Sequence, residues 1–251
     1  MNAIEITERI RLDHLLVETG AFASRSRARD AILRGTVRVE GQTVSKPGQL
    51  VNRDTAIDLN DPAQAYVSRG ALKLKSALDH FGLSPKGRIA LDVGASTGGF
   101  TQVLLENGAT RVFAVDVGHD QMAQSLADDP RVTNIEGLNA RDLTLADLGG
   151  EHPGFVVSDV SFISLKLALP PALNLAAPGA EVILLVKPQF EVGRARIGKG
   201  GLVSPDNAEA CARDLADWLA RQPGWQVLGR CPSPISGGDG NAEFLLAGRK
   251  S

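Results

Sequence analysis

The pattern of apolar and polar residues changes character near residue 69. From there onward, short apolar runs alternate with stretches whose apolar residues recur at helical spacing. This alternation is typical of an α/β fold in which helices cover both faces of a doubly wound sheet. We predict helices over about 69–81, 97–107, 163–176 and 205–222. Seven strands are predicted, at about 89–93, 111–117, 132–136, 155–160, 181–187, 225–230 and 243–248.

The last two predicted strands are joined by a loop, residues 232–241, that is too short for a crossover helix. Parallel neighbours need such a crossover, so we expect these two strands to pair antiparallel. An antiparallel hairpin at the edge of a seven-stranded and otherwise parallel sheet resembles the class I (Rossmann-like) methyltransferase fold.

Residues 10–60 have the pattern of a small α+β domain of their own. Two short helices, each with one apolar face, are followed by a few short strands. We predict that Ser26 is the N-cap of the second helix and that Gly35 ends this helix. Residues 61–68 are polar at their start and contain a proline, so they are predicted to be a linker to the large domain, residues 69–251.

Composition and charge narrow the class of protein. The chain has 251 residues, 43% of them hydrophobic, and a net charge of −2, so a nucleic acid would have to meet a local patch of positive charge. The most apolar region, residues 165–186, is interrupted by prolines, a glycine and charge, and no membrane span is expected. The two cysteines lack metal-ligand spacing. We therefore expect a cytoplasmic protein with no metal and no membrane partner.

The stretch from Asp92 to Gly99 carries the prediction of a ligand. An apolar run ends in Asp92, and glycines at 94, 98 and 99 follow before the next helical pattern begins. A strand, a tight glycine turn and a helix in this order allow a ligand to approach the backbone. The phosphate-binding fingerprint G-x-G-x-x-G and the Walker lysine are both absent from this stretch.

A carboxylate inside this turn favours a nucleoside that carries positive charge. Asp92 would repel a pyrophosphate and attract a sulfonium, and Asp116, near the end of the second strand, is placed to bind both hydroxyls of a ribose. We predict S-adenosylmethionine, with another nucleotide or no ligand as the alternative. For residues 139–142, helix capping is an equal alternative to a contact with adenine. The predicted cofactor-binding residues are Asp92, Gly94, Ser96, Thr97, Gly98, Gly99, Asp116, Asn139 and Asp142.

Four further charged residues are predicted to meet at the same edge of the sheet. Ligands of such sheets bind beyond the carboxyl ends of the strands, and Asp159 and Lys187 end the fourth and fifth strands there. Glu243 opens the seventh strand, and Lys73 lies on the helix before the first. Each residue taken singly is more simply a structural ion-pair partner, but together the four form a candidate active site.

Arginines cluster in and around the second helix of the small domain. Such a cluster suits contacts with phosphates, and a solvated helix face is the alternative. The run from Arg11 to Gly48 resembles an S4 domain, the small RNA-binding module of ribosomal protein S4 and of pseudouridine synthases. The resemblance implies that the arginines face structured RNA. A glycine-rich loop near residue 198 is predicted to grip RNA backbone as well, with a flexible solvated loop as the alternative. The predicted RNA-binding residues are Arg25, Arg27, Arg29, Arg34, Arg194, Arg196 and Lys199.

The motifs of the large domain, DVGASTGGF, SDVSFISL and VKPQFE, carry a second resemblance. The domain resembles the FtsJ-type ribose 2′-O-methyltransferases, and the S4 domain ahead of it makes the whole chain similar to the TlyA family, some of whose members are called hemolysins. The resemblance implies methylation of cytidine ribose by S-adenosylmethionine in ribosomal RNA of the small subunit and, in many members, of the large subunit. The family's Lys-Asp-Lys-Glu tetrad corresponds to Lys73, Asp159, Lys187 and Glu243.

The residue types of this tetrad agree with such chemistry. A ribose hydroxyl is a weak acid and must lose its proton as it attacks the methyl carbon. Lys187 is the expected base, because the charge of Lys73 and partial burial both favour a neutral amine. Asp159 and Glu243 are expected to orient the two lysines and to offset their charge.

Three alternatives remain at this stage. A non-catalytic RNA-binding or ribosome-assembly factor would not need the complete tetrad. A membrane-lytic hemolysin would need a segment that inserts into a bilayer, and none is found. A base methyltransferase acting on exocyclic nitrogens would need Asn/Asp-Pro-Pro-Tyr/Phe after the fourth strand, where residues 159–162 read Asp-Val-Ser-Phe.

Overall fold

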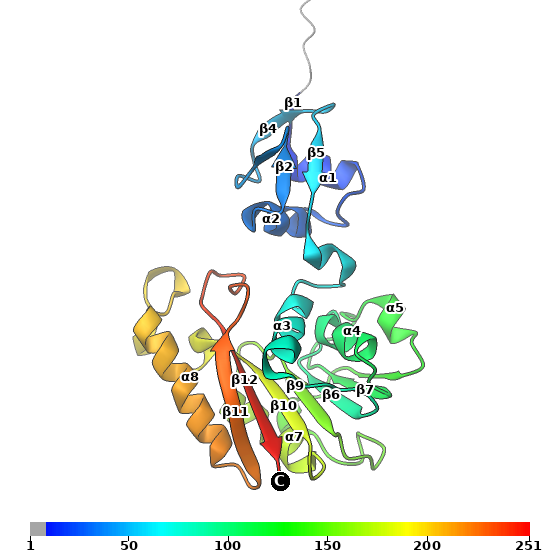
Figure 1. Cartoon of the computed structure of the whole chain (residues 1–251), viewed down its shortest axis with the longest axis vertical. Helices are drawn as coiled ribbons and strands as arrows, with labels where there is room; N and C mark the ends of the chain where they lie inside the picture. Colours follow the sequence, from blue (N-terminus) through cyan, green and yellow to red (C-terminus); the bar gives the residue numbers. More distant parts are fainter. Residues whose placement is uncertain (1–8) are drawn as a thin grey trace, which may run out of the picture. The chain divides into compact units, whose positions relative to one another are not determined.

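Residues 9–251 are described by the structure, a computed structural model, and they form two compact units. The first unit ends at Ala65, and the second runs from Tyr66 to Ser251. The second is a sheet with helices on both faces, and the first is a small mixture of short helices and strands (Figure 1). The predicted fold class is therefore confirmed.

The second unit is built on one seven-stranded sheet with the order β11-β12-β10-β9-β6-β7-β8. Its strands are β6 (Ile89–Val93), β7 (Arg111–Val115), β8 (Val132–Ile135), β9 (Phe155–Ser158), β10 (Glu181–Val186), β11 (Trp225–Pro232) and β12 (Phe244–Lys250). β12 pairs antiparallel with β10 and with β11, and the other neighbours pair parallel. The predicted antiparallel hairpin at the edge is confirmed.

Helices cover both faces because the central strands are apolar on both sides. Ile183 and Leu185 of β10 belong to a core formed with α3 and α4, whereas Val182 and Leu184 belong to a second core formed with α7 and α8. The helices of this unit are α3 (Ala71–Phe81), α4 (Gly99–Glu106), α5 (Gln124–Ala127), α6 (Leu165–Ala168), α7 (Pro170–Leu175) and α8 (Pro205–Ala220). Short 3-10 helices are η2 (Ala140–Asp142), η3 (Pro188–Phe190), η4 (Arg194–Arg196) and η5 (Lys199–Gly201).

The chain reverses its direction of travel across the sheet between β6 and β9. From β6 it proceeds outward through β7 to the edge strand β8, and it then returns to place β9 on the other side of β6. The turns that follow β6 and β9 therefore leave the sheet toward opposite faces and open a crevice between them. This is the position at which doubly wound sheets bind ligands.

The helix predicted over 163–176 is two short helices in the structure. α6 ends at Ala168, and α7 begins at Pro170. Pro170 and Pro171 have no backbone N–H to donate, so they fit the first turn of a new helix and not the interior of a longer one. The apolar periodicity that predicted one helix is real, since Leu165, Leu169 and Leu173 are all buried.

The first unit has a short helix pair and two small sheets. Its helices are α1 (Leu12–Glu18), α2 (Arg25–Leu33) and the 3-10 helix η1 (Pro62–Ala65). β1 (Arg9–Arg11) pairs with β4 (Leu50–Asn52), and β2 (Val37–Val39) lies between β3 (Gln42–Thr43) and β5 (Ile57–Leu59). The predicted cap at Ser26 is wrong. α2 begins two residues earlier, and the Ser24 side chain accepts a hydrogen bond from the Arg27 amide.

The stretch predicted to be a linker, 61–68, is held at both of its ends. Asp61 accepts two hydrogen bonds from Arg34, at 2.8 and 2.9 Å, within the first unit. Within the second unit, the amide of Val67 donates to Gln102 Oε1 at 2.9 Å. The boundary between the two compact units, Ala65 to Tyr66, falls between these two contacts.

Glu40 provides a test of backbone strain in the first unit. It occupies the left-handed region, with φ of +50°, in the turn between β2 and β3. Asparagine tolerates this conformation better than glutamate does, so we expect Glu40→Asn to stabilise the strand pair by about 1 kcal/mol. The measurement is hydrogen exchange of the Val44 amide, which donates to the Val37 carbonyl. Glu40→Ala is the control, because it removes the charge and keeps the strain. An equal gain in both variants would show that charge, and not conformation, is responsible.

Candidate functional site

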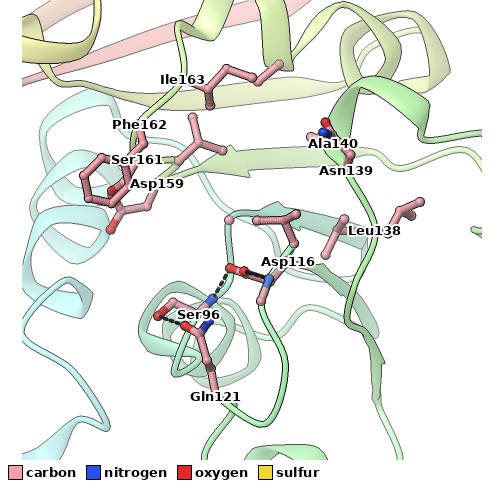
Figure 2. A pocket seen from close by; sticks show the side chains of 16 residues that line it. Ser96, Asp116, Gln121, Leu138, Asn139, Ala140, Asp159, Ser161, Phe162 and Ile163 are labelled. Carbon is pink, nitrogen blue, oxygen red and sulfur yellow. Dashed lines mark hydrogen bonds between the residues drawn. The ribbon is translucent and has the colours of Figure 1, made fainter.

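A hollow of about 520 Å³ opens at the crevice between β6 and β9. Its walls come from the residues that follow β6, β7, β8 and β9, so four consecutive strand ends contribute to it. Figure 2 shows Ser96, Asp116 and Gln121 on one side and Asp159, Ser161 and Phe162 on another. Its volume is in the range of small-molecule sites.

The turn after β6 approaches the turn after β9 very closely. Gly94 has φ of +85°, and a Cβ atom added there would lie 3.0 Å from the Cα and backbone N of Val160. Gly98, with φ of +93°, precedes α4, and a Cβ on it would lie 2.4 Å from Leu126. Only glycine fits these two positions. Gly94 lines the hollow, whereas Gly98 packs against α5 and does not line it.

Asp116 presents a fixed carboxylate at the wall of this hollow. One oxygen accepts from the Ser96 amide at 2.8 Å, and the other accepts from the Gly118 amide at 2.7 Å. The Ser96 hydroxyl donates to Gln121 Oε1 at 3.0 Å (Figure 2). Each carboxylate oxygen keeps a further lone pair for a ligand hydroxyl. Residues from two different strand ends thus hold one acceptor group in place.

Asp92 does not reach the hollow, which corrects the expectation that it would line the ligand site. It belongs to β6 and is fully buried, and its Oδ2 accepts from the Thr101 hydroxyl of α4 at 2.7 Å. Burial raises the pKa of the Asp92 carboxyl to about 7, and the charges of Asp159 and Asp116 act in the same direction. Asp92 therefore links β6 to α4 through Thr101.

A second hollow of about 210 Å³ adjoins the first. The two share wall residues from the turns after β6 and β9, namely Gly94, Ser96, Asp159 and Ser161. The predicted ligand residues Thr97 and Gly99 line this second hollow and not the first. Lys73 and Lys187 lie in its wall. A molecule in one hollow would therefore be next to a molecule in the other.

Three of the four predicted catalytic residues, Lys73, Asp159 and Lys187, line this second hollow, and the fourth, Glu243, does not line it but pairs with Lys73. Lys187 Nζ lies 2.6 Å from Asp159 Oδ1 and donates to the Ser161 hydroxyl at 2.7 Å. Lys73 Nζ lies 2.5 Å from Glu243 Oε2, with both side chains almost fully buried. Burial raises the pKa of the Glu243 carboxyl, and the Lys73 and Lys187 ammonium groups oppose that rise.

Phe162 is an exposed aromatic residue at the mouth of the larger hollow. Its side chain is 90% exposed, and its backbone is left-handed with φ of +66°. The ring lies 5.0 Å from that of Phe190, between centroids. A bulky residue in this conformation is uncommon and strained, and such strain clusters at functional sites.

Of the two ligand-contacting residues predicted within 139–142, the structure places one at the larger hollow and the other outside both hollows. Asn139 lines the larger hollow, and its Oδ1 accepts from the Arg141 amide at 3.1 Å, so it also caps η2. Asp142 is exposed and lies outside both hollows.

The arginines of α2 differ in what they contact. Arg34 departs from the prediction, since its guanidinium is held between Asp30 and Asp61 and only 16% of its side chain is exposed. Arg25 is exposed and lies 3.3 Å from the buried Asp13, whose pKa a hydrogen bond from Arg11 lowers to about 2. Arg27 donates to the Ala63 carbonyl at 3.2 Å. Arg29 is exposed, as are the loop residues Arg194, Arg196 and Lys199 of the second unit.

Sequence reasoning missed several polar residues of the site. Thr101 holds Asp92, Ser161 holds Lys187, and Gln121 holds Ser96. Ser161 lies two residues beyond Asp159, within a motif that was recognised, and that position was a usable signal. Gln121 sits in an irregular loop, and nothing in the local pattern marks it.

Residues 9–251 contain neither a candidate membrane span nor a candidate metal cluster. No helix there is long and apolar enough to cross a membrane. Within the same residues, no three His, Cys, Asp or Glu side chains gather in a way that could hold a metal ion.

Comparison with protein families matches both units. The FtsJ-like methyltransferase model matches residues 66–250, and the S4 domain model matches residues 10–57.

Individual relatives match over nearly the whole chain. A protein of Mycobacterium tuberculosis named 16S/23S rRNA (cytidine-2′-O)-methyltransferase TlyA is 44% identical over 96% of this chain and 90% of its own length. Hemolysin A of Brachyspira hyodysenteriae is 39% identical over 94% of this chain and 98% of its own length. A solved structure from Streptococcus thermophilus, provisionally named a hemolysin, has a TM-score of 0.76 and 40% identity, covering 98% of this chain and 90% of that one.

The raised pKa of Asp92 generates a prediction about stability. Because the folded pKa, about 7, lies above the usual value of 3.8, the protonated carboxyl stabilises the fold at low pH, and that contribution is lost as pH rises through 7. Asp92→Asn stays uncharged, so its free energy of unfolding relative to wild type should increase from pH 4 to 7 by up to ~1.4 kcal/mol per pH unit and then level off. Urea unfolding across this range measures it. A difference that does not vary with pH would contradict the assignment.

Proposed function

We propose a function for this chain from one premise: it belongs to the TlyA family, in which an S4 domain precedes an FtsJ-like methyltransferase domain. The proposed reaction is transfer of a methyl group from S-adenosylmethionine to the 2′-hydroxyl of a cytidine ribose in ribosomal RNA. One observation carries it. Two hollows share the wall formed by Gly94, Ser96, Asp159 and Ser161, and both lysines, each paired with a carboxylate, line the smaller one.

The larger hollow fits S-adenosylmethionine, which supplies an electrophilic methyl carbon when bound. Its volume of about 520 Å³ suits a nucleoside of this size. Asp116 is fixed by two backbone amides and can accept hydrogen bonds from ribose hydroxyls. Gly94 lines the hollow with backbone, and the absence of a side chain lets its turn approach Val160 closely. Leu138 and Asn139 offer an apolar contact and an amide to the nucleobase.

The smaller hollow fits the ribose that accepts the methyl group. Lys187, in its neutral form, would take the proton from the 2′-hydroxyl as the oxygen attacks. Asp159 and Ser161 hold its Nζ in place. The Lys73 ammonium, fixed by Glu243, would stabilise the negative charge that develops on that oxygen. Holding both reactants in adjoining hollows supplies much of the rate.

RNA contacts would come from both units. Arg25, Arg27 and Arg29 of the S4 domain, together with Arg194, Arg196 and Lys199, would meet phosphates. We leave Arg34 out of this set, because carboxylates occupy its guanidinium. The exposed ring of Phe162 offers a surface on which a base can stack. An enzyme that modifies ribosomal RNA in this way would work in the cytoplasm.

Removing the proposed base tests the reaction. Lys187→Ala should lower methyl transfer to ribosomal RNA by roughly 100-fold or more. Binding of S-adenosylmethionine should persist, because Lys187 does not line the larger hollow. Transfer of labelled methyl groups measures the rate, mass-spectrometric mapping identifies the modified ribose, and calorimetry gives the donor affinity. Lys75→Ala, on an exposed part of α3, is the control. Near-normal turnover by Lys187→Ala would show that Lys187 is not the proton acceptor. Methylation of a nucleobase atom by wild type would overturn the proposed reaction itself.

A second prediction concerns Phe162. Because base–aromatic stacking contributes roughly 1–3 kcal/mol, Phe162→Ala should raise the KM for RNA by about 5- to 100-fold. The folded state should not lose stability, since the side chain is 90% exposed. Leu167→Ala, which removes another exposed apolar side chain nearby in sequence, is the matched control. Equal KM values for the two variants would argue against a stacking role.

A further inference from the structure

Asn241 is a buried polar residue for which the proposed reaction provides no role. It lies in the segment between β11 and β12, two residues before Glu243, and it is only 2% exposed. Its Oδ1 accepts from the amide of Val203 at 2.9 Å, and its Nδ2 donates to the carbonyl of Gly201 at 3.0 Å. The amide group thus makes the two bonds that an adjacent strand would make with this piece of backbone.

The backbone that Asn241 holds is the base of a cationic loop, residues 194–203. The loop closes on itself through the amide of Gly198, which donates to the carbonyl of Leu202 at 2.7 Å, and through a bridge between Ile197 and Val203. All three of its cations are exposed to solvent. The loop that Asn241 holds therefore places positive charge at the surface.

On its other side, Asn241 is fixed to the segments that bear catalytic residues. Its amide donates to Asp239 Oδ1 at 3.0 Å, and its carbonyl accepts from the Gly237 amide at 2.9 Å. The second oxygen of Asp239 accepts from Gln189 Nε2 at 3.1 Å. Gln189 lies in η3, which begins directly after Lys187. Three segments meet here: the cationic loop, the segment before Glu243 and the helix after Lys187.

We propose that Asn241 is a positioning residue that couples the cationic loop to the lysine–carboxylate pairs. RNA phosphates gripped by the loop are thereby held at a fixed distance from the ribose site. The inference rests on the proposed function and adds to it a residue that touches neither donor nor RNA. Direct coupling through one buried amide matters because the loop's own bonds, Gly198 to Leu202 and Ile197 to Val203, do not attach it to the sheet.

Limited proteolysis tests the anchor without reference to catalysis. Trypsin cleaves after the lysine and arginines of the loop, and cleavage there requires local opening. In Asn241→Ala and Asn241→Asp, cleavage after Arg194, Arg196 or Lys199 should accelerate by about tenfold or more, because the bonds at the base of the loop are lost or replaced by oxygen–oxygen repulsion. The control is Asn107→Ala, which removes a similar amide bond to the Val103 carbonyl after α4. Unchanged cleavage in the folded Asn241 variants would overturn the anchor.

Binding and kinetics test the coupling. Filter binding to ribosomal RNA should weaken by about tenfold in Asn241→Ala, while the affinity for S-adenosylmethionine stays within about twofold of wild type. A merely structural defect would lower both. Asn241→Asp, which preserves volume, guards against misfolding of the alanine variant. Normal RNA binding by a variant whose loop is cleaved rapidly would overturn the coupling.

A mutant cycle separates this inference from the proposed function. The triple change Arg194→Ala, Arg196→Ala and Lys199→Ala removes the cations, and adding Asn241→Ala to it should weaken RNA binding by less than about twofold more. Full additivity would show that Asn241 acts elsewhere and overturn the proposal. If wild type does not methylate ribosomal RNA, the proposed reaction fails, and the proteolysis and binding results still decide the role of Asn241.

Discussion

The site depends on the close approach of the turn after β6 to the turn after β9. Gly94 leaves no room for a Cβ atom, which would lie 3.0 Å from the backbone of Val160. Both hollows share walls made by these two turns, so the main chain itself holds the proposed donor and acceptor positions side by side. The parallel pairing of β6 with β9 fixes the two turns relative to each other. A rate gain from proximity requires a rigid frame of this kind.

The charges around the smaller hollow form the second level of organisation. Lys187 pairs with Asp159 near the opening, and Lys73 pairs with Glu243 at greater depth. Removing one member of a buried pair leaves the other charge uncompensated, at a cost of about 3–5 kcal/mol. The two carboxylates therefore hold the two lysines in place beside one polar hollow and offset the charge of each while it is protonated. Asp92 accepts a hydrogen bond from the Thr101 hydroxyl and does not belong to this set of charges.

How much of this follows from the sequence depends on whether the deciding interaction is local. The alternation of apolar runs with helical patterns predicted the central strands, and the short loop between the last two strands predicted the antiparallel edge. Both signals depend only on residues that are close together in the sequence. The cap of α2 and the break at Pro170 are local as well, but apolar periodicity alone does not mark either of them. The buried Asp92 carboxylate is paired with a hydroxyl from α4, and the Arg34 guanidinium is occupied by Asp61. The bonds of Asn241 join segments about 40 residues apart, and no pattern in the sequence marks them.

The Lys73–Glu243 pair joins residues that are 170 positions apart in the chain. During synthesis, α3 leaves the ribosome long before β12 is made, and Lys73 then has no carboxylate to neutralise it. This ion pair can form only when the final strand inserts between β10 and β11. A nascent or C-terminally truncated chain therefore lacks the partner that holds Lys73, and the proposed active site gains it as the last residues fold.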